Sequence, residues 1–327
     1  MQAEKKVILA EPRSFCAGVR RAIAIIELAL ERYGPPVYVR KEIVHNHYVV
    51  GQLKRRGARF VDSEDEVPEG AICVFSAHGV SPQVRQNAQS RQLDVIDATC
   101  PLVSKVHQEA KRYAVQGRIL LLVGHADHEE VEGTYGHAPT QTVIIESVAD
   151  AERLDLAPDT PVAYLTQTTL SVDETRDIIG VLERRFTDLV GPGTDDICYA
   201  SQNRQDAIKA IVHRSDLVLV VGSLNSSNSI RMVEVARRHG VAARLVPDVT
   251  DFDPAWLAGV STIGMSAGAS APEILVDELL EAVAEHGYTT VEIESVAEEN
   301  VVFSPPARLT QWPEPAVQTR GEEHRRC

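Results

Sequence analysis

The sequence predicts an α/β protein built from three related α/β units whose mainly parallel sheets surround a central cavity. Three observations lead to this fold class. Apolar runs alternate with amphipathic segments, a cysteine stands before a helical pattern three times, and polar clusters follow each cysteine at similar distances. Alternating strands and helices are typical of parallel sheets covered by helices, and equivalent positions of a threefold repeat can converge near one axis.

The alternation is clearest in five apolar runs that have the length of strands and contain β-branched residues. They are AICVFSA, ILLLVGH, PVAYLTQ, LVLVVGS and VSTIGMS, and amphipathic segments such as VRRAIAIIELALERYG separate them. We expect three units with boundaries at 1–97, 98–195 and 196–304. The remaining segment, 305–327, is polar and rich in proline, so we expect a flexible tail.

Three of the five cysteines stand at equivalent places. Cys16 precedes AGVRRAIAIIELA, Cys100 precedes PLVSKVHQEAKRYA, and Cys198 precedes YASQNRQDAIKAIV. At a helix start, unpaired N–H groups and the helix dipole favour an anion, so a cysteine there tends toward the thiolate that binds metals. Three thiolates suit either a zinc site with one open position or a four-iron four-sulfur cluster with one iron lacking a protein ligand. The spacing alone leaves both alternatives open.

The other two cysteines have ordinary surroundings. Cys73 lies inside the apolar run AICVFSA, where we expect a packed side chain, and Cys327 ends the tail. Five cysteines that are widely spaced and odd in number do not form the pattern of a disulfide framework.

Two sets of polar loops repeat with the cysteines. His45, His128 and Ser226 follow their cysteines by 29, 28 and 28 positions. His78, Thr168 and Ser270 follow by 62, 68 and 72 positions. The expected phosphate donors among these loops are neutral or weakly basic side chains, namely His45, His78, His128, Ser226, Asn228 and Ser270. A histidine can also gain charge beside an anion. The loops therefore predict a diphosphate pocket.

The charge of the whole chain makes such a local pocket necessary. With 33 basic and 47 acidic residues, the net charge is −14, which argues against nucleic acid or an anionic membrane surface as a partner. No stretch approaches the length of a membrane-spanning helix, and the N-terminal apolar run is too short for a secretory signal. We expect a cytoplasmic protein.

A general acid is expected in the segment HEEVEG, which contains Glu129, Glu130 and Glu132. A carboxyl group shielded from water can hold a proton near neutral pH and deliver it to a reacting group. Glu129 and Glu130 point in different directions, so only one of them is expected to face the cavity. Three further histidines, namely His107, His213 and His286, are assigned structural roles.

Two other functions compete with this interpretation. The segment GMSAG, residues 264–268, matches the nucleophile elbow of serine hydrolases, but only His286 and His324 follow it as candidate bases. A non-catalytic iron–sulfur sensor would also use the cysteines. No basic stripe or DNA-binding pattern supports that role, and it would leave the phosphate loops without a purpose.

At the level of motifs, the chain resembles the 4-hydroxy-3-methylbut-2-enyl diphosphate reductase family, the last enzyme of the methylerythritol phosphate route to isoprenoids. The resemblance covers roughly residues 5–304 and follows the motifs in their order. These are FCAGVRRA, EIVHN, SAHGVSP, DATCPLVSKVH, HEEVEGTYGH, TQTTLSVDET, DDICYASQNRQ, VVGSLNSSNS and SAGASAPE.

The resemblance implies a fold of three α/β domains around a 4Fe-4S iron–sulfur cluster, which Cys16, Cys100 and Cys198 would hold with one iron open to the substrate. It implies reductive dehydroxylation of the allylic diphosphate to isopentenyl and dimethylallyl diphosphate, with two electrons and two protons. Glu130 would deliver protons, and Thr168 would bond the substrate hydroxyl and relay them. An electron donor protein such as ferredoxin or flavodoxin would be the partner. The diphosphate would be bound by His45, His78, His128, Ser226, Ser227, Asn228 and Ser270.

The chain departs from the family's pattern beside His128. Where glycine and proline are common, it has Asp127 and Glu129, which add two carboxylates close to the expected diphosphate pocket. We expect them to affect the local loop geometry and the pH optimum, but not the reaction.

Overall fold

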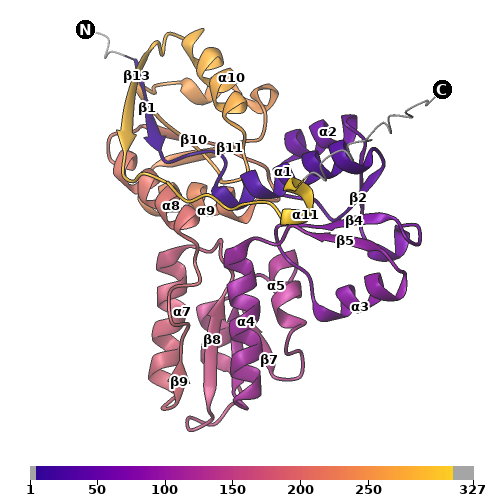
Figure 1. Cartoon of the computed structure of the whole chain (residues 1–327). Coiled ribbons are helices and arrows are strands. Elements are labelled where there is room, and N and C mark those ends of the chain that lie inside the picture. Colours follow the sequence, from indigo (N-terminus) through magenta and orange to yellow (C-terminus); the bar gives the residue numbers. More distant parts are fainter. Residues whose placement is uncertain (1–4, 312–327) are drawn as a thin grey trace, which may run out of the picture.

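The computed structural model describes residues 5–311, which form three parallel sheets covered by helices. The strand orders are β3-β2-β4-β5 in the first sheet, β7-β6-β8-β9 in the second, and β11-β10-β12-β1-β13 in the third. Every strand pair recorded within these residues is parallel. The three units appear as three lobes that meet at the centre of the molecule (Figure 1). The predicted fold class is confirmed.

The elements follow each other as strand, loop and helix in each unit. The first unit has β2 (Val37–Arg40), β3 (Ala58–Val61), β4 (Ile72–Phe75), β5 (Asp94–Asp97), α1 (Ala17–Tyr33), α2 (His47–Arg55) and α3 (Pro82–Ser90). The second has β6 (Ile119–Val123), β7 (Thr142–Ile145), β8 (Val162–Thr166), β9 (Leu189–Val190), α4 (Pro101–Val115), α5 (Glu129–Tyr135), α6 (Val148–Arg153) and α7 (Val172–Arg185). The third has β1 (Lys6–Glu11), β10 (Leu217–Val221), β11 (Ala242–Val246), β12 (Thr262–Ala267), β13 (Thr290–Ser295), α8 (Tyr199–Val212), α9 (Ser227–Arg238) and α10 (Glu273–Ala284).

Strand β1 belongs to the third sheet, although the sequence places it beside the first unit. Lys6 pairs with Thr262 of β12 on one side and with Thr290 of β13 on the other. In strand order, β1 takes the place in the third sheet that β5 and β9 take in theirs. Each of these three strands leads to a cysteine and then to a helix of the next unit.

The helices that follow the cysteines pack in a different unit from the strands that precede them. Helix α1 buries Ile25 and Ile26 against the first sheet, whereas β1 lies in the third. Likewise, α4 contributes Val106 to the core of the second unit, and α8 contributes Ile208 to the core of the third. Each cysteine therefore lies at a junction between two units, which is why three distant segments meet at the centre.

The segment after β13 connects the third unit back to the first. It crosses the molecule and ends in the short helix α11 (Ala307–Thr310) beside α1 (Figure 1). Leu309 is only 1% exposed and packs in the core of the first unit. The start of the expected flexible tail is thus part of the fold, and its remainder, with Cys327, lies outside the described residues.

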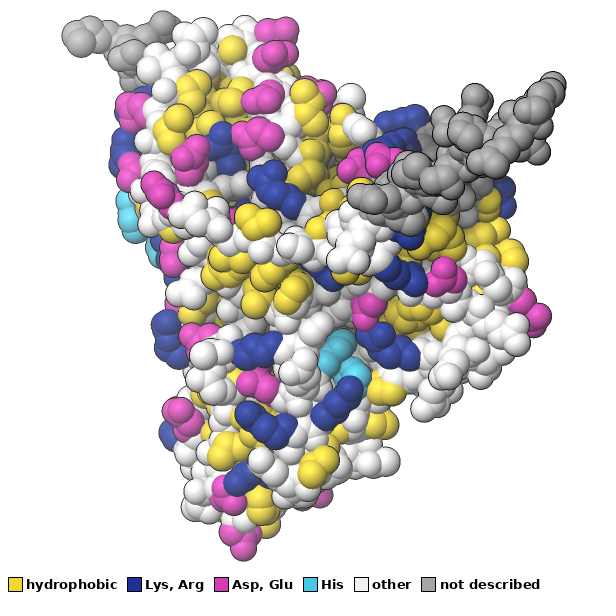
Figure 2. All heavy atoms as spheres, viewed as in Figure 1, with side chains coloured by type: hydrophobic (Ala, Val, Ile, Leu, Met, Phe, Trp, Pro, Cys, Tyr) yellow, Lys and Arg dark blue, Asp and Glu magenta, His cyan; other side chains and the backbone are white. Residues whose placement is uncertain are grey.

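Charged side chains of both signs lie on the visible surface (Figure 2). Acidic and basic side chains are intermixed on the face of the described chain that Figure 2 shows. Within residues 5–311, no helix has both the length and the apolar character needed to cross a membrane.

Candidate functional site

A central cavity lies where the carboxyl ends of the three sheets meet, which is the usual place for ligands in parallel α/β structures. The structure brings every predicted site residue to its wall. The lining includes Cys16, Cys100, Cys198, His45, His78, His128, Glu130, Thr168, Ser226, Ser227, Asn228 and Ser270.

Each of the three cysteines occupies the N-cap position of its helix, directly before α1, α4 or α8. The predicted helix starts are confirmed. A Cβ atom added to Gly18 would lie 2.8 Å from the Cys100 sulfur and 3.8 Å from the Cys16 sulfur. Only glycine therefore leaves room for the Cys100 sulfur beside the first turn of α1, whereas the distance to the Cys16 sulfur is an ordinary van der Waals contact.

The expected ease of ionisation is wrong for two of these thiols. Burial raises the pKa of the Cys100 thiol to about 12 and that of the Cys198 thiol to about 11. Hydrogen bonds from backbone N–H groups lower the pKa of both thiols, but by less than burial raises it. One of these donors is the Ser201 N–H, which lies 3.3 Å from the Cys198 sulfur. Binding of a metal centre would therefore release protons from these thiols.

The surroundings of the cysteines fit an iron–sulfur cluster. All three thiols are free, and the apolar side chains of Val19, Val103 and Phe303 share the cavity wall with them. Thiolate ligands are those that iron–sulfur clusters use, and an apolar shell limits solvent access to such a centre. Phe303 belongs to the crossing segment after β13, so that segment closes one side of the cavity.

Three histidines form a compact group on the cavity wall. The rings of His45 and His78 are stacked, with centroids 4.0 Å apart and an interplanar angle of 15°. His128 stands edge-on to both, at 5.3 and 5.7 Å. Burial and neighbouring histidines hold the pKa of His78 and of His128 below its usual value. His78 and His128 are thus neutral by themselves and able to take up protons when an anion enters.

The stacking of His45 and His78 favours binding of an anion over binding of a metal ion at the three histidines. His45, His78 and Glu129 offer ligand atoms that lie within 4.8 Å of one another. A metal ion binds in the plane of an imidazole ring, along its nitrogen lone pair, and the planes of two rings stacked almost in parallel do not meet within ligand distance of both rings. The arrangement therefore favours hydrogen bonds to an anion.

Glu130 and Thr168 form a buried polar pair between the histidines and the cysteines. Glu130 is 2% exposed and lies in the first turn of α5, and its N–H donates to His128 Nδ1 at 3.1 Å. The Thr168 N–H and hydroxyl donate to its two carboxyl oxygens at 2.6 and 3.0 Å. Burial raises the pKa of Glu130 to about 7, and the charge of Asp196 adds to the effect. Glu130 can therefore hold a proton at neutral pH, as expected.

The loops of the third unit are tied to the other loops. Ser226 is the N-cap of α9, and Asn228 accepts a hydrogen bond from the Ala269 N–H at 2.8 Å. The Ser270 hydroxyl donates to the His45 carbonyl at 3.0 Å and thereby links the third unit to the first. These contacts fix the loops before any ligand binds, which lowers the cost of ordering them.

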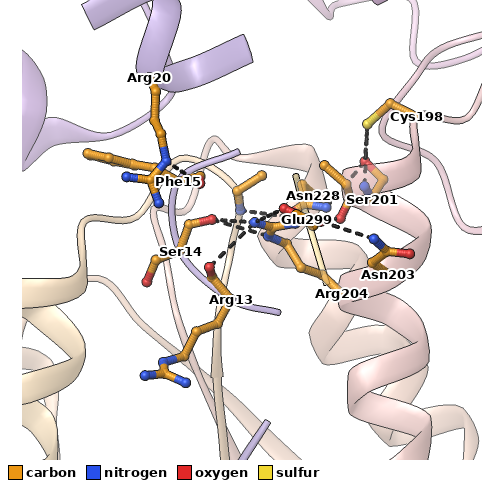
Figure 3. Close-up of polar contacts among 12 residues, drawn as sticks. Arg13, Ser14, Phe15, Arg20, Cys198, Ser201, Asn203, Arg204, Asn228 and Glu299 are labelled. Carbon is orange, nitrogen blue, oxygen red and sulfur yellow. Dashed lines mark hydrogen bonds and ion pairs between the residues drawn. The ribbon is translucent and has the colours of Figure 1, made fainter. Parts of the chain in front are cut away.

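Sequence reasoning missed the residue that joins the two loops beside Cys16 and Cys198. Arg204 of α8 is fully buried and donates to the carbonyls of Ser14 and Ala200 at 2.6 and 2.9 Å. It also pairs with Glu299 of the crossing segment at 2.9 Å, as Figure 3 shows. A charged residue on an amphipathic helix is ordinarily exposed, so the pattern gave no signal for it.

The remaining assignments concern residues outside the cavity. His107 is buried, and a Cβ atom on Gly79 would lie 2.6 Å from its ring, so it supports the loop that carries His78. This position agrees with the structural role predicted for His107.

Ser266 of GMSAG is fully buried within β12, whereas a nucleophile elbow exposes its serine at the turn after a strand. This geometry does not suit a hydrolase.

Comparisons with known proteins agree with the site. A family model described as LytB protein matches residues 7–284. The 4-hydroxy-3-methylbut-2-enyl diphosphate reductase of Burkholderia pseudomallei is 55% identical over 94% of this chain and 98% of its own length. That of Acidothermus cellulolyticus is 53% identical over 98% and 93%. The structure of the E-1-hydroxy-2-methyl-but-2-enyl-4-diphosphate reductase from Plasmodium falciparum superposes with a TM-score of 0.91, at 38% identity, over 94% of this chain and 97% of that one.

Proposed function

The chain belongs to the LytB protein family, and we propose that it is a 4-hydroxy-3-methylbut-2-enyl diphosphate reductase. It is an oxidoreductase that takes two electrons and two protons, removes the allylic hydroxyl as water, and yields isopentenyl or dimethylallyl diphosphate. The observation that carries this conclusion is the convergence of three free cysteines, three histidines and a buried carboxyl group on one cavity.

Cys16, Cys100 and Cys198 would hold a 4Fe-4S cluster as its three protein ligands. When bound, the cluster supplies the electrons one at a time and an open Lewis-acid position. The high pKa values of Cys100 and Cys198 mean that holding the cluster displaces thiol protons.

The diphosphate is bound by donors from all three units. His45 and His78 come from the first unit, His128 from the second, and the serine and asparagine donors from the third. The third-unit donors are Ser226, Ser227, Asn228 and Ser270. Because these groups contact the part of the substrate that does not react, their binding energy serves mainly to orient the allylic end.

Glu130 delivers protons through Thr168. A protonated Glu130 carboxyl group can donate along the 3.0 Å contact to the Thr168 hydroxyl, whose own proton then turns toward the cavity. The first proton leaves with the hydroxyl as water, and the second is added to the allylic fragment. Addition at one end or the other of the fragment gives one product or the other.

The electrons come from a donor protein such as a ferredoxin or a flavodoxin, because the three cysteines would serve as cluster ligands and the other side chains proposed here are not redox-active. A non-catalytic iron–sulfur sensor remains the second candidate. It gives no reason for the stacked histidines or for the buried pair of Glu130 and Thr168.

The test is anaerobic purification followed by iron and sulfide analysis, Mössbauer spectroscopy and a reductase assay with the allylic diphosphate and a chemical reductant. We expect iron and sulfide in near-equal amounts and both isoprenoid products. Zinc without sulfide would overturn the cluster assignment. An intact cluster without product formation would favour the sensor.

A further inference from the structure

Glu129 contacts one of the three histidines and has no role in the mechanism above. Its Oε2 atom lies 3.1 Å from Nδ1 of His78. The two residues come from different units, since His78 follows β4 and Glu129 begins α5. Their side chains are only 14% and 20% exposed, so water competes little for this contact.

The contact determines which nitrogen of His78 carries a proton. Although burial opposes ionisation, the hydrogen bond from His78, together with the positive charge of Lys41, holds the pKa of Glu129 below its usual value. An ionised carboxylate can only accept, so Nδ1 of His78 must donate. The Ser76 hydroxyl, 3.4 Å from the same nitrogen, is a more distant partner.

This tautomer has a consequence for the other nitrogen. With Nδ1 protonated, a neutral His78 has a bare Nε2, which repels an anionic oxygen in place of donating to it. His78 can donate to a diphosphate from Nε2 only by taking up a second proton. The ring then becomes an imidazolium held between two anions, which is the arrangement that gives short, charge-assisted hydrogen bonds.

We propose that Glu129 is a positioning residue that fixes the Nδ1–H of His78 and thereby makes this histidine bind the substrate diphosphate as an imidazolium. The proposal rests on the proposed function in one respect, namely that the anion which meets His78 is the diphosphate. The step is a proton uptake coupled to binding, and solvent supplies the proton.

The other charges around His78 do not replace Glu129. His45 and His128 surround the ring, and the charge of a protonated His45 would oppose its protonation. Glu42 favours protonation, but its carboxylate lies 3.5 Å from Nδ1 of His45 and already accepts from Asn225 at 2.8 Å. Lys41 acts on Glu129 and keeps its carboxyl group ionised. Glu129 is therefore the one carboxylate with a direct hydrogen bond to His78 among the described residues.

The test measures binding of inorganic pyrophosphate to the cluster-loaded protein by calorimetry between about pH 6.5 and pH 8.5, in buffers of different ionisation enthalpy. The variants are Glu129→Gln, which keeps the shape and removes the charge, and Glu132→Gln as a matched control. Glu132 lies on the same helix and is more than half exposed beside Arg40. Circular dichroism and iron content establish that each variant is folded and loaded.

Wild-type protein and Glu132→Gln should take up protons on binding, and this uptake should fall only toward the upper end of the range, where the pH approaches the pKa of the bound imidazolium. Glu129→Gln should take up fewer and bind roughly tenfold more weakly at the upper end of the range. In the reductase assay, Glu129→Gln should raise KM with little change in kcat. Equal affinity and proton uptake in wild type and Glu129→Gln, or no binding by either, would overturn the proposal. Wild-type protein that binds pyrophosphate with proton uptake but makes neither product would instead refute the proposed function.

Discussion

The carboxyl group of Glu130 receives two hydrogen bonds from Thr168, one from the backbone N–H at 2.6 Å and one from the hydroxyl at 3.0 Å. Both oxygens are thus held by one residue, inside a wall that leaves Glu130 2% exposed. The geometry fixes the direction in which a proton can leave. Both hydrogen bonds favour the ionised carboxylate, but burial has the larger effect and raises the pKa of Glu130.

Replacement of Glu130 by glutamine should keep the cluster and remove most of the turnover. The amide has nearly the same shape but cannot transfer a proton, and loss of a general acid typically reduces a rate roughly 10²- to 10⁴-fold. Single-turnover kinetics together with iron analysis would measure both quantities. A rate near that of wild type in a cluster-loaded Glu130→Gln sample would contradict the assigned role.

The dependence of turnover on pH should follow the same group. Burial raises the pKa of Glu130 to about 7, so the acid form is present below that pH and is lost above it. We expect kcat to fall as the pH rises through about 7, and Glu130→Gln should lack this decrease.

The stability of the fold should also decrease with rising pH, because the pKa of Glu130 in the folded state exceeds its ordinary value of 4.5. The contribution of Glu130 to folding stability should therefore decrease between these two values and stay low above them. A kcat that rises through this range in wild type would be inconsistent with a proton held on Glu130.

Replacement of Cys16 by serine should cost the cluster far more than the fold. The side chain is small, lies at a junction between units, and is only partly buried against the edge of the first unit's core, so a serine of similar size should cost the fold little. Cys73→Ser is the matched control, because Cys73 is fully buried in β4 and is not among the residues that line the cavity. Cys16→Ser should lose most of its iron at nearly unchanged unfolding free energy, and Cys73→Ser should keep its iron and lose about 1–3 kcal/mol by burying an unpaired hydroxyl. Full iron content in Cys16→Ser would exclude it as a ligand.

Much of this site could be predicted because its signals are local. A cysteine before an amphipathic run marks a helix start, and the N-cap positions of Cys16, Cys100 and Cys198 show that these boundaries were read correctly. The polar loops could be recognised in the same way, since they stand between a strand and a helix pattern.

Other features could not be predicted because they depend on which segments pair. The run KVILAE is equally suited to any buried parallel strand, and only the assembled sheet places β1 between β12 and β13. The contact of Glu129 with His78 joins residues 51 positions apart in different units. Its two carboxyl neighbours in sequence have the same chemistry, so the pattern alone could not show which of them reaches the histidine.

Replacement of Glu299 by glutamine should destabilise the protein and expose the cluster. Arg204 is fully buried, so removal of its carboxylate partner leaves a charge without compensation, at a cost of about 3 kcal/mol. Glu294→Gln on the adjacent strand is the control, because its pair with Arg214 is exposed and should contribute less than about 1 kcal/mol. Since Glu299 anchors the segment that carries Phe303 to the cavity wall, the variant should also lose cluster absorbance faster in air. Urea unfolding and the rate of bleaching measure the two effects. If Glu299→Gln unfolds and bleaches like Glu294→Gln, the buried pair does not hold this segment in place.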